Sequence, residues 1–327
     1  MAAAPVAVLL SSYGGPEGPG DCEPYLRRIF LDPDLVPLPS FLRPFLARRL
    51  AHRRTPALRA VYEAMGSYSP ILEQTRAQAA ALQAALGEGF ACYVGMRYFA
   101  PLLADVCAEI ARAGHETVVH LPLYPQESRA TAGSAVNEAR RALTALGWSG
   151  AQREVRSFWD RPAYLDALAE GVGRALKEAP AGAALLFSAH GLPLSVAKRD
   201  PYPGQVEATA RAVCGRVGRA LTVSIAPAVV AAGEAGLAWQ GKVGPLRWIE
   251  PSVAAVLEAY IAAGRTHVVV VPLSFVSEHS ETLYELDILY AGLARRAGLG
   301  FTRVPALQTH PGLVAALAEA VREAAAK

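Results

Sequence analysis

The sequence predicts an α/β protein with two lobes, each built on a parallel β-sheet flanked by helices. Short apolar runs alternate with longer amphipathic, Ala-rich segments from end to end, which is typical of repeated strand–helix–strand units. With 327 residues and 52% hydrophobic content, the chain is long enough for two hydrophobic cores. The alternation is interrupted near residues 153–164 by Ser-Phe-Trp-Asp-Arg-Pro, which indicates a boundary between the lobes.

The elements follow from the period of the apolar residues. Apolar runs of strand length predict strands at residues 6–10, 91–95, 117–123, 183–188, 221–225 and 267–273. Longer segments of helical period predict helices at residues 102–113, 135–146, 162–177, 207–220, 251–263 and 312–325. We expect a first lobe at residues 1–156 and a second at 157–304, with a terminal helix over about 305–327 packing back on the first. The chain shows no repeat of about 20–50 residues.

Composition excludes several classes of protein. A net charge of +3 is too small for nucleic acid to be the main partner, and Arg outnumbers Lys, which suits recognition of carboxylates. Its apolar runs are shorter than the ~20 residues that a membrane span needs, and its first ten residues lack the basic start of a signal peptide; we expect a cytoplasmic protein. The cysteines have no C-x-x-C spacing, which argues against a zinc site, a cysteine-only iron–sulfur cluster or a disulfide scaffold. They are Cys22, Cys92, Cys107 and Cys214.

Three loops that follow predicted strands are candidates for ligand binding, because ligands of parallel sheets lie beyond the carboxyl ends of the strands. They span residues 11–20, 124–134 and 189–193. The first is rich in glycine but matches neither G-x-G-x-x-G nor the phosphate-binding G-x-x-x-x-G-K-[ST], so nucleotide binding has little support.

His190 ends the predicted strand at 183–188 and precedes a glycine. An imidazole at such a strand end can accept a proton near neutral pH or bind a metal; the alternative is a buried histidine that is bonded to backbone. A Ser188–His190–Asp200 hydrolase is disfavoured, because Ser188 lies within a strand and the nucleophile motif G-x-S-x-G is missing.

The segment 268–287 joins four consecutive valines to a cluster of acids and a histidine. The cluster contains Glu278, His279, Glu281 and Glu285, and in a helix that begins near Glu278 the three carboxylates would share one stripe. Oxygen and imidazole ligands suit a divalent cation. The alternative is a solvated helix start, where acids are favoured by the helix dipole.

Taken in order along the chain, these motifs resemble those of the ferrochelatases, enzymes that insert ferrous iron into a porphyrin. The resemblance covers nearly the whole chain and rests on Tyr13-Gly-Gly-Pro-Glu17, Gly66-Ser-Tyr-Ser-Pro70, Met96-Arg-Tyr98, Leu123-Tyr-Pro-Gln126, Leu185-Leu-Phe-Ser-Ala-His-Gly-Leu-Pro193, Asp200-Pro-Tyr-Pro203, Val243-Gly-Pro245, Trp248-Ile-Glu-Pro251 and Phe275-Val-Ser-Glu-His-Ser-Glu-Thr-Leu-Tyr-Glu-Leu-Asp287. It implies a chelatase-like fold with two Rossmann-like lobes and a porphyrin cleft between them.

The resemblance also assigns roles in catalysis. It implies that His190 and Glu281 are catalytic, and that both contribute to a metal site with Glu278, His279 and Glu285 on an acidic path for metal or protons. The chain departs from the usual His-Ile-Glu at His279-Ser-Glu281. It also ends without the cysteine-bearing extension that binds a [2Fe–2S] cluster in some relatives, so we expect no cofactor beyond the substrate Fe²⁺.

Porphyrin-binding residues are implied in the first lobe. Tyr13 matches a porphyrin-contacting position, and Arg97, Tyr98 and Ser128 match residues that line the pocket or meet propionates. Gly66-Ser-Tyr-Ser replaces a stretch that is richer in glycine in the family, which changes the contour of the pocket.

Residues 35–54 combine an apolar face that includes Phe41 and Phe45 with a rim of arginines. The resemblance implies that this segment forms one lip of the porphyrin cleft, with Arg side chains that suit propionates. The same face suits peripheral contact with the inner face of a membrane, and the third alternative is an ordinary helix that packs on the body of the protein.

The resemblance leaves the choice between protoporphyrin IX and coproporphyrin III open, as well as the oligomeric state. Tyr13 favours coproporphyrin III, whereas Leu123-Tyr-Pro-Gln126 resembles relatives that use protoporphyrin IX. Two other functions are weighed against iron insertion: a chelatase for Co²⁺ or Ni²⁺, and a non-catalytic porphyrin or haem carrier. A carrier needs neither a base nor an acidic path, so His190 and Glu281 favour an enzyme.

Overall fold

The computed structural model describes residues 5–36, 38–222, 235–242 and 244–327. The chain forms two compact units: unit 1 comprises Met1–Phe158 and Val314–Lys327, and unit 2 comprises Trp159–Leu313. The units divide within the segment 153–164 where the sequence interrupts its alternation, and most of the terminal helix α12 (Pro311–Ala325) belongs to unit 1. Within these ranges, no helix has the length and apolar character that crossing a membrane requires.

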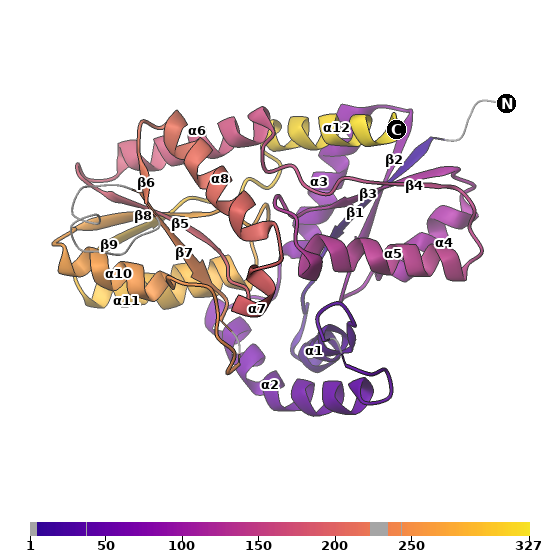
Figure 1. Ribbon diagram of the computed structural model, residues 1–327, viewed down its shortest axis with the longest axis horizontal. Coiled ribbons are helices and arrows are strands. Elements are labelled where there is room, and N and C mark those ends of the chain that lie inside the picture. Colours follow the sequence, from indigo (N-terminus) through magenta and orange to yellow (C-terminus); the bar gives the residue numbers. More distant parts are fainter. Residues whose placement is uncertain (1–4, 37, 223–234, 243) are drawn as a thin grey trace. The chain divides into compact units, whose positions relative to one another are not determined.

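The sheet of unit 1 has the strand order β2-β1-β3-β4, and every pairing is parallel (Figure 1). Its strands are β1 (Val6–Ser12), β2 (Phe90–Met96), β3 (Thr117–Pro122) and β4 (Ala151–Glu154). Because side chains alternate along a strand, Ala7, Leu9 and Val118 reach one face, where they pack against α4 (Leu103–Arg112) and α5 (Ser134–Ala145).

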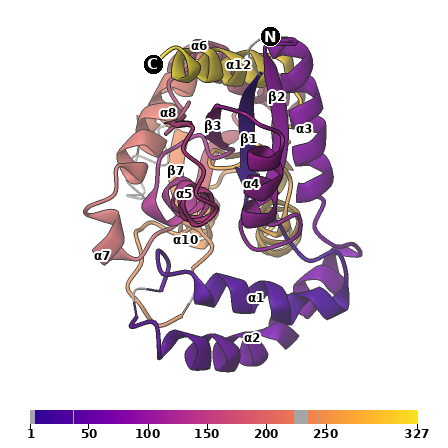
Figure 2. The same cartoon turned by 90° about the vertical axis from the view of Figure 1, so that its right-hand side faces the viewer.

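The remaining helices of unit 1 are α1 (Cys22–Leu31), α2 (Arg43–Met65) and α3 (Ile71–Leu86). Helix α3 contacts β1 and β2, and Arg322 of α12 donates to the carbonyl of Ala85 at its end. Helices α1 and α2 pack on each other and lie apart from the sheet (Figure 2). The buried residues of α2 recur at helical spacing, as Ala47, Ala51, Thr55 and Tyr62.

The sheet of unit 2 has the order β6-β7-β5-β8-β9 and is also parallel throughout. Its strands are β5 (Ala184–His190), β6 (Leu221–Thr222), β7 (Ala235–Gln240), β8 (His267–Pro272) and β9 (Gly300–Arg303). One face packs against α10 (Val253–Ala262) and α11 (Ala291–Arg296), and the other contacts α6 (Pro162–Glu178) and α8 (Tyr202–Arg216). A short helix, α7 (Leu194–Ala197), follows β5.

The two units repeat one pattern of strands, register and connecting hydrogen bonds. In each, a π-helix follows the third strand of the pattern: η2 (Arg129–Gly133) after β3 and η3 (Glu281–Tyr290) after β8. Three backbone hydrogen bonds of unit 1 have equivalents in unit 2. Leu123 N to Ser11 O matches Leu273 N to Ser188 O (both 2.8 Å), and Met96 N to Pro101 O (2.7 Å) matches Trp239 N to Pro251 O (2.9 Å). The third pair is Val155 N to His120 O (2.9 Å) and Val304 N to Val270 O (2.8 Å). The repeated unit is thus about half the chain, much longer than the roughly 20–50 residues of a typical sequence repeat.

The predicted elements are present with shifted bounds. The short elements that were not predicted are β4, β7, β9, η1 (Pro19–Asp21) and η2, and the helices that were not predicted are α1, α3, α7 and α11. The predicted strand at 221–225 is observed as β6 up to Thr222, and its remainder lies outside the described residues.

Candidate active site

The candidate site of unit 2 forms where β5 and β7 end side by side. His190 is the last residue of β5 and pairs in register with Gln240, the last residue of β7. Both are at the carboxyl edge of the sheet, where the sequence analysis expected chemistry. The first turn of η3 brings Glu281 to the same place.

His190 Nδ1 lies 2.8 Å from Glu281 Oε2. The two side chains are 33% and 27% exposed, so substrate can reach them although both lie against protein. Burial lowers the pKa of His190, but the Glu281 carboxylate and, to a smaller extent, Glu285 raise it, and the net shift is upward. For Glu281, burial raises the pKa and the His190 ring lowers it, with a net shift downward. The contact therefore stabilises protonated His190 beside an ionised Glu281, and the ring is neutral at a pH above its raised pKa.

Glu285 stands beside this pair and is held by β7. Its Oε2 accepts from Gln240 Nε2 (3.2 Å) and from the backbone N–H of Gly241 (3.1 Å). Burial, followed by the nearby charge of Glu281, raises the pKa of Glu285 to about 7. This carboxyl can consequently exchange a proton near neutral pH.

His279 lies next to the pair in a different state. Its Nδ1 accepts from the backbone N–H of Glu281 at 3.0 Å, and its ring meets Phe275 edge to face at 4.4 Å. Burial lowers the pKa of His279 below its ordinary value, against the opposing effect of Glu281. A ring that accepts through Nδ1 is neutral and carries its single N–H proton at Nε2. His279 therefore caps the start of η3 as a neutral ring.

Glu278 departs from the predicted stripe. The helix η3 begins at Glu281, and Glu278 precedes it in a loop where its Oε1 accepts from Arg303 Nη1 and from the backbone N–H of Ala306, both at 2.9 Å. The prediction that Glu278, Glu281 and Glu285 share one face is wrong for Glu278, because the π-helix starts later than an α-helix beginning near Glu278 would. Asp287, which the same helical geometry places on the far side, shares Arg303 with Glu278.

No group of three or more His, Cys, Asp or Glu side chains among the described residues is arranged to hold a metal ion. His190, Glu281 and Glu285 therefore offer a base, a charged partner and a proton acceptor without forming a closed metal cage.

The predicted porphyrin residues of unit 1 lie around one aromatic cluster. The Tyr13 and Tyr98 rings stack at 5.1 Å. When the two sheets are aligned by strand register, Tyr13 after β1 occupies the position that His190 has at the end of β5. Tyr98 is fully buried, with its hydroxyl donating to Asp32 at 2.5 Å. The guanidinium of Arg97 contacts Asp32 at 3.0 Å and Glu138 at 3.4 Å. Arg97 and Tyr98 thus support Tyr13 from within the unit, and their contact with a porphyrin stays a prediction.

Ser128 is also buried, and its hydroxyl accepts from the backbone N–H of Ala130 at 3.3 Å, which caps η2. Its neighbour Tyr13 donates to the carbonyl of Ala130 at 3.0 Å. The structure thus connects Ser128 with Tyr13 through one turn of backbone.

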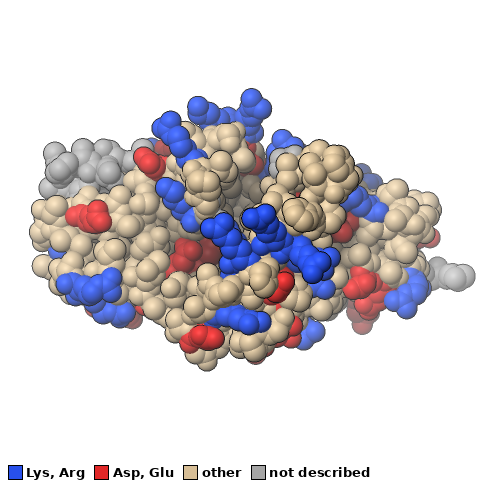
Figure 3. Space-filling view, turned by 90° about the horizontal axis from the view of Figure 1, so that it is seen from below, with Lys and Arg blue, Asp and Glu red and all other residues tan. Residues whose placement is uncertain are grey.

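Phe41 and Phe45 are 77% and 72% exposed, so neither belongs to the core of unit 1. This excludes the ordinary packed helix as the explanation for their apolar character. Lys and Arg side chains gather on the face that Figure 3 shows, where α2 lies toward the viewer. The exposed phenylalanines and the basic residues of α2 together suit a ligand or surface that is both apolar and anionic.

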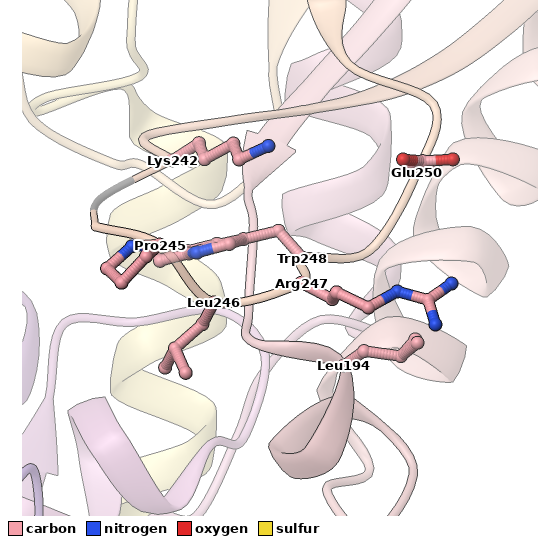
Figure 4. Close-up of a pocket in the computed structure, with 7 residues that line it drawn as sticks. All are labelled: Leu194, Lys242, Pro245, Leu246, Arg247, Trp248 and Glu250. Atoms are coloured by element: carbon pink, nitrogen blue, oxygen red, sulfur yellow. The ribbon is translucent and has the colours of Figure 1, made fainter.

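A second group of side chains borders His190 in unit 2. Trp248 meets the His190 ring edge to face at 6.2 Å, and it lines a pocket of about 290 Å³ together with Leu194, Lys242, Pro245, Leu246, Arg247 and Glu250 (Figure 4). An adjoining pocket of about 590 Å³ reaches Gly191 and Gln240 at the strand ends.

Sequence reasoning missed Gln240 and Gly241. Gln240 is buried; its Oε1 accepts from Ser188 at 2.5 Å and its Nε2 donates to the carbonyl of Glu281 at 2.8 Å. Gly241 has φ +75°, and a Cβ there would lie 2.6 Å from His190 Nδ1. The available signal was weak: a Gln-Gly pair after an apolar run at 235–239.

Solved structures of other proteins share this fold. SirB from Bacillus subtilis, in a structure with Fe³⁺, superposes with a TM-score of 0.58 at 11% identity, covering 98% of this chain and 96% of that one. CbiX, described as the terminal enzyme for biosynthesis of sirohaem in denitrifying bacteria, gives a TM-score of 0.50 at 16% identity, covering 98% and 99%.

Sequence comparison then gives the family. The family model for ferrochelatase matches residues 5–325. The ferrochelatases of Geotalea daltonii, Geobacter metallireducens and Aquifex aeolicus are 41%, 42% and 41% identical, over 97%, 97% and 96% of this chain and 97%, 98% and 98% of their own lengths. The chain belongs to the ferrochelatase family and is a porphyrin metal chelatase.

Proposed function

We propose that this protein inserts Fe²⁺ into protoporphyrin IX or coproporphyrin III, with His190 as the base and Glu281 as its charged partner. The single observation that carries this assignment is the 2.8 Å contact between His190 Nδ1 and Glu281 Oε2 at the carboxyl edge of the sheet. Both residues match the catalytic positions of the family motifs, and the carrier alternative gives no reason for such a pair.

The geometry orients the imidazole for proton transfer. When His190 is neutral, its Nδ1–H donates to Glu281 and its lone pair is at Nε2, which makes no hydrogen bond within the described residues. A carboxylate that fixes one ring nitrogen makes the other more basic. His190 Nε2 therefore accepts a proton from a pyrrole N–H, and Glu281 stabilises the imidazolium that results.

Metallation releases two protons, and Glu285 provides a place for the second. With a pKa of about 7, its carboxyl gains or loses a proton at little free-energy cost near neutral pH. The positive charge that His190 gains on protonation lowers the pKa of Glu285, so Glu285 then releases its proton to bulk water.

The porphyrin contacts are proposed for unit 1. Tyr13, supported by Tyr98 and Arg97, offers an aromatic surface for the macrocycle, and Ser128 fixes the turn beside it. Phe41 and Phe45 provide exposed apolar contact, with arginines of α2 for the propionates. We also propose that the same phenylalanines can contact a membrane surface, and flotation with anionic liposomes tests this proposal.

The assignment is tested by anaerobic metallation of each porphyrin with Fe²⁺, Co²⁺ and Ni²⁺ in turn, using wild type, His190→Ala and His310→Ala. His310 is the matched control, since it also contacts a glutamate (Glu170, 3.4 Å) in unit 2 and is 30% exposed. We expect His190→Ala to lose metallation and still bind porphyrin, and His310→Ala to behave as wild type. Turnover near the wild-type rate in His190→Ala contradicts the role of the base, and faster turnover with Co²⁺ or Ni²⁺ than with Fe²⁺ contradicts the metal.

A further inference from the structure

Arg303 joins three parts of unit 2 that the sequence keeps apart. It is the last residue of β9, and its side chain is 11% exposed. Its Nη1 donates to Glu278 Oε1 at 2.9 Å, while Nε and Nη2 donate to the two oxygens of Asp287 at 2.7 and 2.8 Å. A planar guanidinium that binds one carboxylate with two parallel hydrogen bonds fixes orientation as well as distance.

The two partners bracket the catalytic glutamate. Glu278 precedes Glu281 in the loop after β8, and Asp287 follows it within η3. Glu278 is itself buried and also accepts from the backbone N–H of Ala306, so this carboxylate is fixed to the segment after β9. Hydrogen bonds from Arg303 of β9 therefore hold the segment that carries Glu281 both before and after that residue.

A π-helix is less stable than an α-helix and persists when its surroundings hold it. The ten residues of η3 are held by two sets of contacts. Gln240, at the end of β7, and Gly241, which follows it, donate to Glu281 O and to the Glu285 carboxylate. Arg303 of β9 donates to Glu278 and Asp287. The strands on which these residues lie flank the β5–β8 pair in the sheet.

Unit 1 provides an internal comparison. In the repeated register, His120 pairs with Glu154 as Val270 pairs with Arg303. Glu154 contacts Arg140 at 2.9 Å and Arg156 at 2.7 Å, both on the surface, and the π-helix of that unit has five residues. The buried arginine that contacts two carboxylates is therefore found in unit 2, together with the longer π-helix and the His190–Glu281 pair.

Glu278 is already paired with Arg303, a single positive charge that also contacts Asp287. Although burial raises the pKa of Glu278, Arg303 and hydrogen bonds to this carboxylate lower it, with a net shift below the ordinary value. Two donors, Arg303 Nη1 and the backbone N–H of Ala306, already occupy Oε1 of this carboxylate. A role for Glu278 in transferring the metal is consequently less suited to this geometry than a structural tie.

We propose that Arg303 is a positioning residue for metallation: through Glu278 and Asp287 it holds η3 in the register that places Glu281 against His190. The inference rests on the proposed roles of His190 and Glu281. In this proposal Glu278 supports the position of Glu281, and it is not part of the acidic path for metal or protons.

The test uses variants of the full chain with a readout that does not depend on turnover. The His190 imidazole is titrated by NMR in the porphyrin-free protein, alongside kcat and KM for metal and porphyrin. In Arg303→Met we expect the His190 pKa to fall and kcat to drop at least about tenfold with KM for porphyrin nearly unchanged, since loss of the Glu281 contact leaves burial to dominate. Arg303→Lys, which keeps a charge but not the planar fork, should recover part of both.

Two further variants keep the result interpretable. Arg303→Met leaves Glu278 buried without Arg303 as its partner and can prevent folding. The double variant Arg303→Met with Glu278→Gln removes that isolated charge. It should fold and show the same lowered pKa of His190. Arg211→Met is the control, because Arg211 belongs to an exposed pair with Glu207 at 2.6 Å and should change neither readout.

The outcomes separate this inference from the proposed function. A folded Arg303 variant with wild-type His190 pKa and kcat overturns the positioning role, as does a Glu278→Gln variant that raises KM for Fe²⁺ alone and leaves the His190 pKa unchanged. Failure of the proposed function appears elsewhere, as retained turnover in His190→Ala, while the NMR titration still reports whether Arg303 positions Glu281.

Discussion

At the scale of single residues, the site depends on a histidine whose environment contains opposing effects. Burial alone would make His190 a weak base, and Glu281 reverses this. The carboxylate therefore does more than orient the ring: it sets the pH range over which the imidazole holds a proton. Glu281→Gln keeps the shape of the side chain and removes that charge.

We expect Glu281→Gln to lower kcat by about 10²-fold or more, in the range typical of general acid–base groups. Since a base is active when neutral, activity of the wild type should fall as pH decreases through the raised pKa of His190. In the variant this acid limb should move to lower pH. Rates measured across the pH range test the sign, and a limb that moves to higher pH contradicts the assignment.

Gly241 allows a second prediction for one residue. A Cβ at this position would lie 2.6 Å from His190 Nδ1 and 2.7 Å from its Cε1, so Gly241→Ala should displace the ring from Glu281 and reduce kcat at least about tenfold. Gly264→Ala is matched in strain, because Gly264 has φ +72° with nothing near the added Cβ. Both variants should lose similar stability, and equal turnover in the two would show that the contact with His190 has no effect on catalysis.

At the scale of elements, the π-helix and the α1–α2 pair carry the features that distinguish this chain from a plain α/β protein. Helix η3 places Glu281 and Glu285 toward β5 and β7, with Glu278 and Asp287 toward Arg303 of β9. Helix α2 buries small residues against α1 and leaves its first turn exposed. One element supports catalysis, and the other provides a surface.

The exposed start of α2 predicts the behaviour of Phe41→Ser with Phe45→Ser. Because both side chains are more than two-thirds exposed, the double variant should keep its melting temperature within a few degrees and bind porphyrin more weakly. Leu146→Ser, which also alters an exposed apolar residue of unit 1, should leave porphyrin affinity unchanged. Flotation with anionic liposomes that is sensitive to salt and is lost in the double variant supports membrane docking; weakened porphyrin binding without flotation supports a porphyrin lip alone. A large fall in melting temperature contradicts both.

At the scale of the whole molecule, the duplicated pattern gave the two units different chemistry at matched positions. His120 of unit 1 corresponds in register to Val270 of unit 2. It is buried, and Gln152 contacts its Nε2 at 3.1 Å. Burial lowers the pKa of His120 to about 4, with Arg140 and Glu154 as the nearby charges. His120 therefore serves the core of unit 1 rather than the reaction.

His120 predicts a loss of stability in mild acid. Its folded-state pKa is depressed, so the unfolded chain binds the additional proton between about pH 6.5 and 4, and stability falls as pH decreases through that window. Between pH 7 and pH 5 this single group should lower the free energy of unfolding by about 2 kcal/mol. Urea unfolding of His120→Gln at both pH values should show a smaller difference by that amount.

His52→Gln is the control for this measurement, since the His52 side chain is 83% exposed. It should retain the wild-type dependence on pH. An unchanged pH dependence in His120→Gln would mean that other groups cause the loss of stability in acid.

The sequence by itself determined the parallel α/β fold and the two loops that carry His190 and Glu281. Buried parallel strands require continuous apolar runs, and such runs can be read directly from 183–188 and 267–273. It also indicated the exposed apolar surface of Phe41 and Phe45, although only their exposure in the structure excluded a packed helix. The order of the motifs was enough to predict the family.

The tertiary structure decided which of these residues act together. The short strands β4 and β9 have too few residues for a clear period, and the start of η3 depends on contacts with other strands, so the stripe containing Glu278 was predicted wrongly. Gln240, Gly241 and Arg303 acquire their roles from hydrogen bonds to residues far away in the chain. Local periodicity contains no information about such pairings, because strand register and side-chain direction fix them only when the sheet is complete.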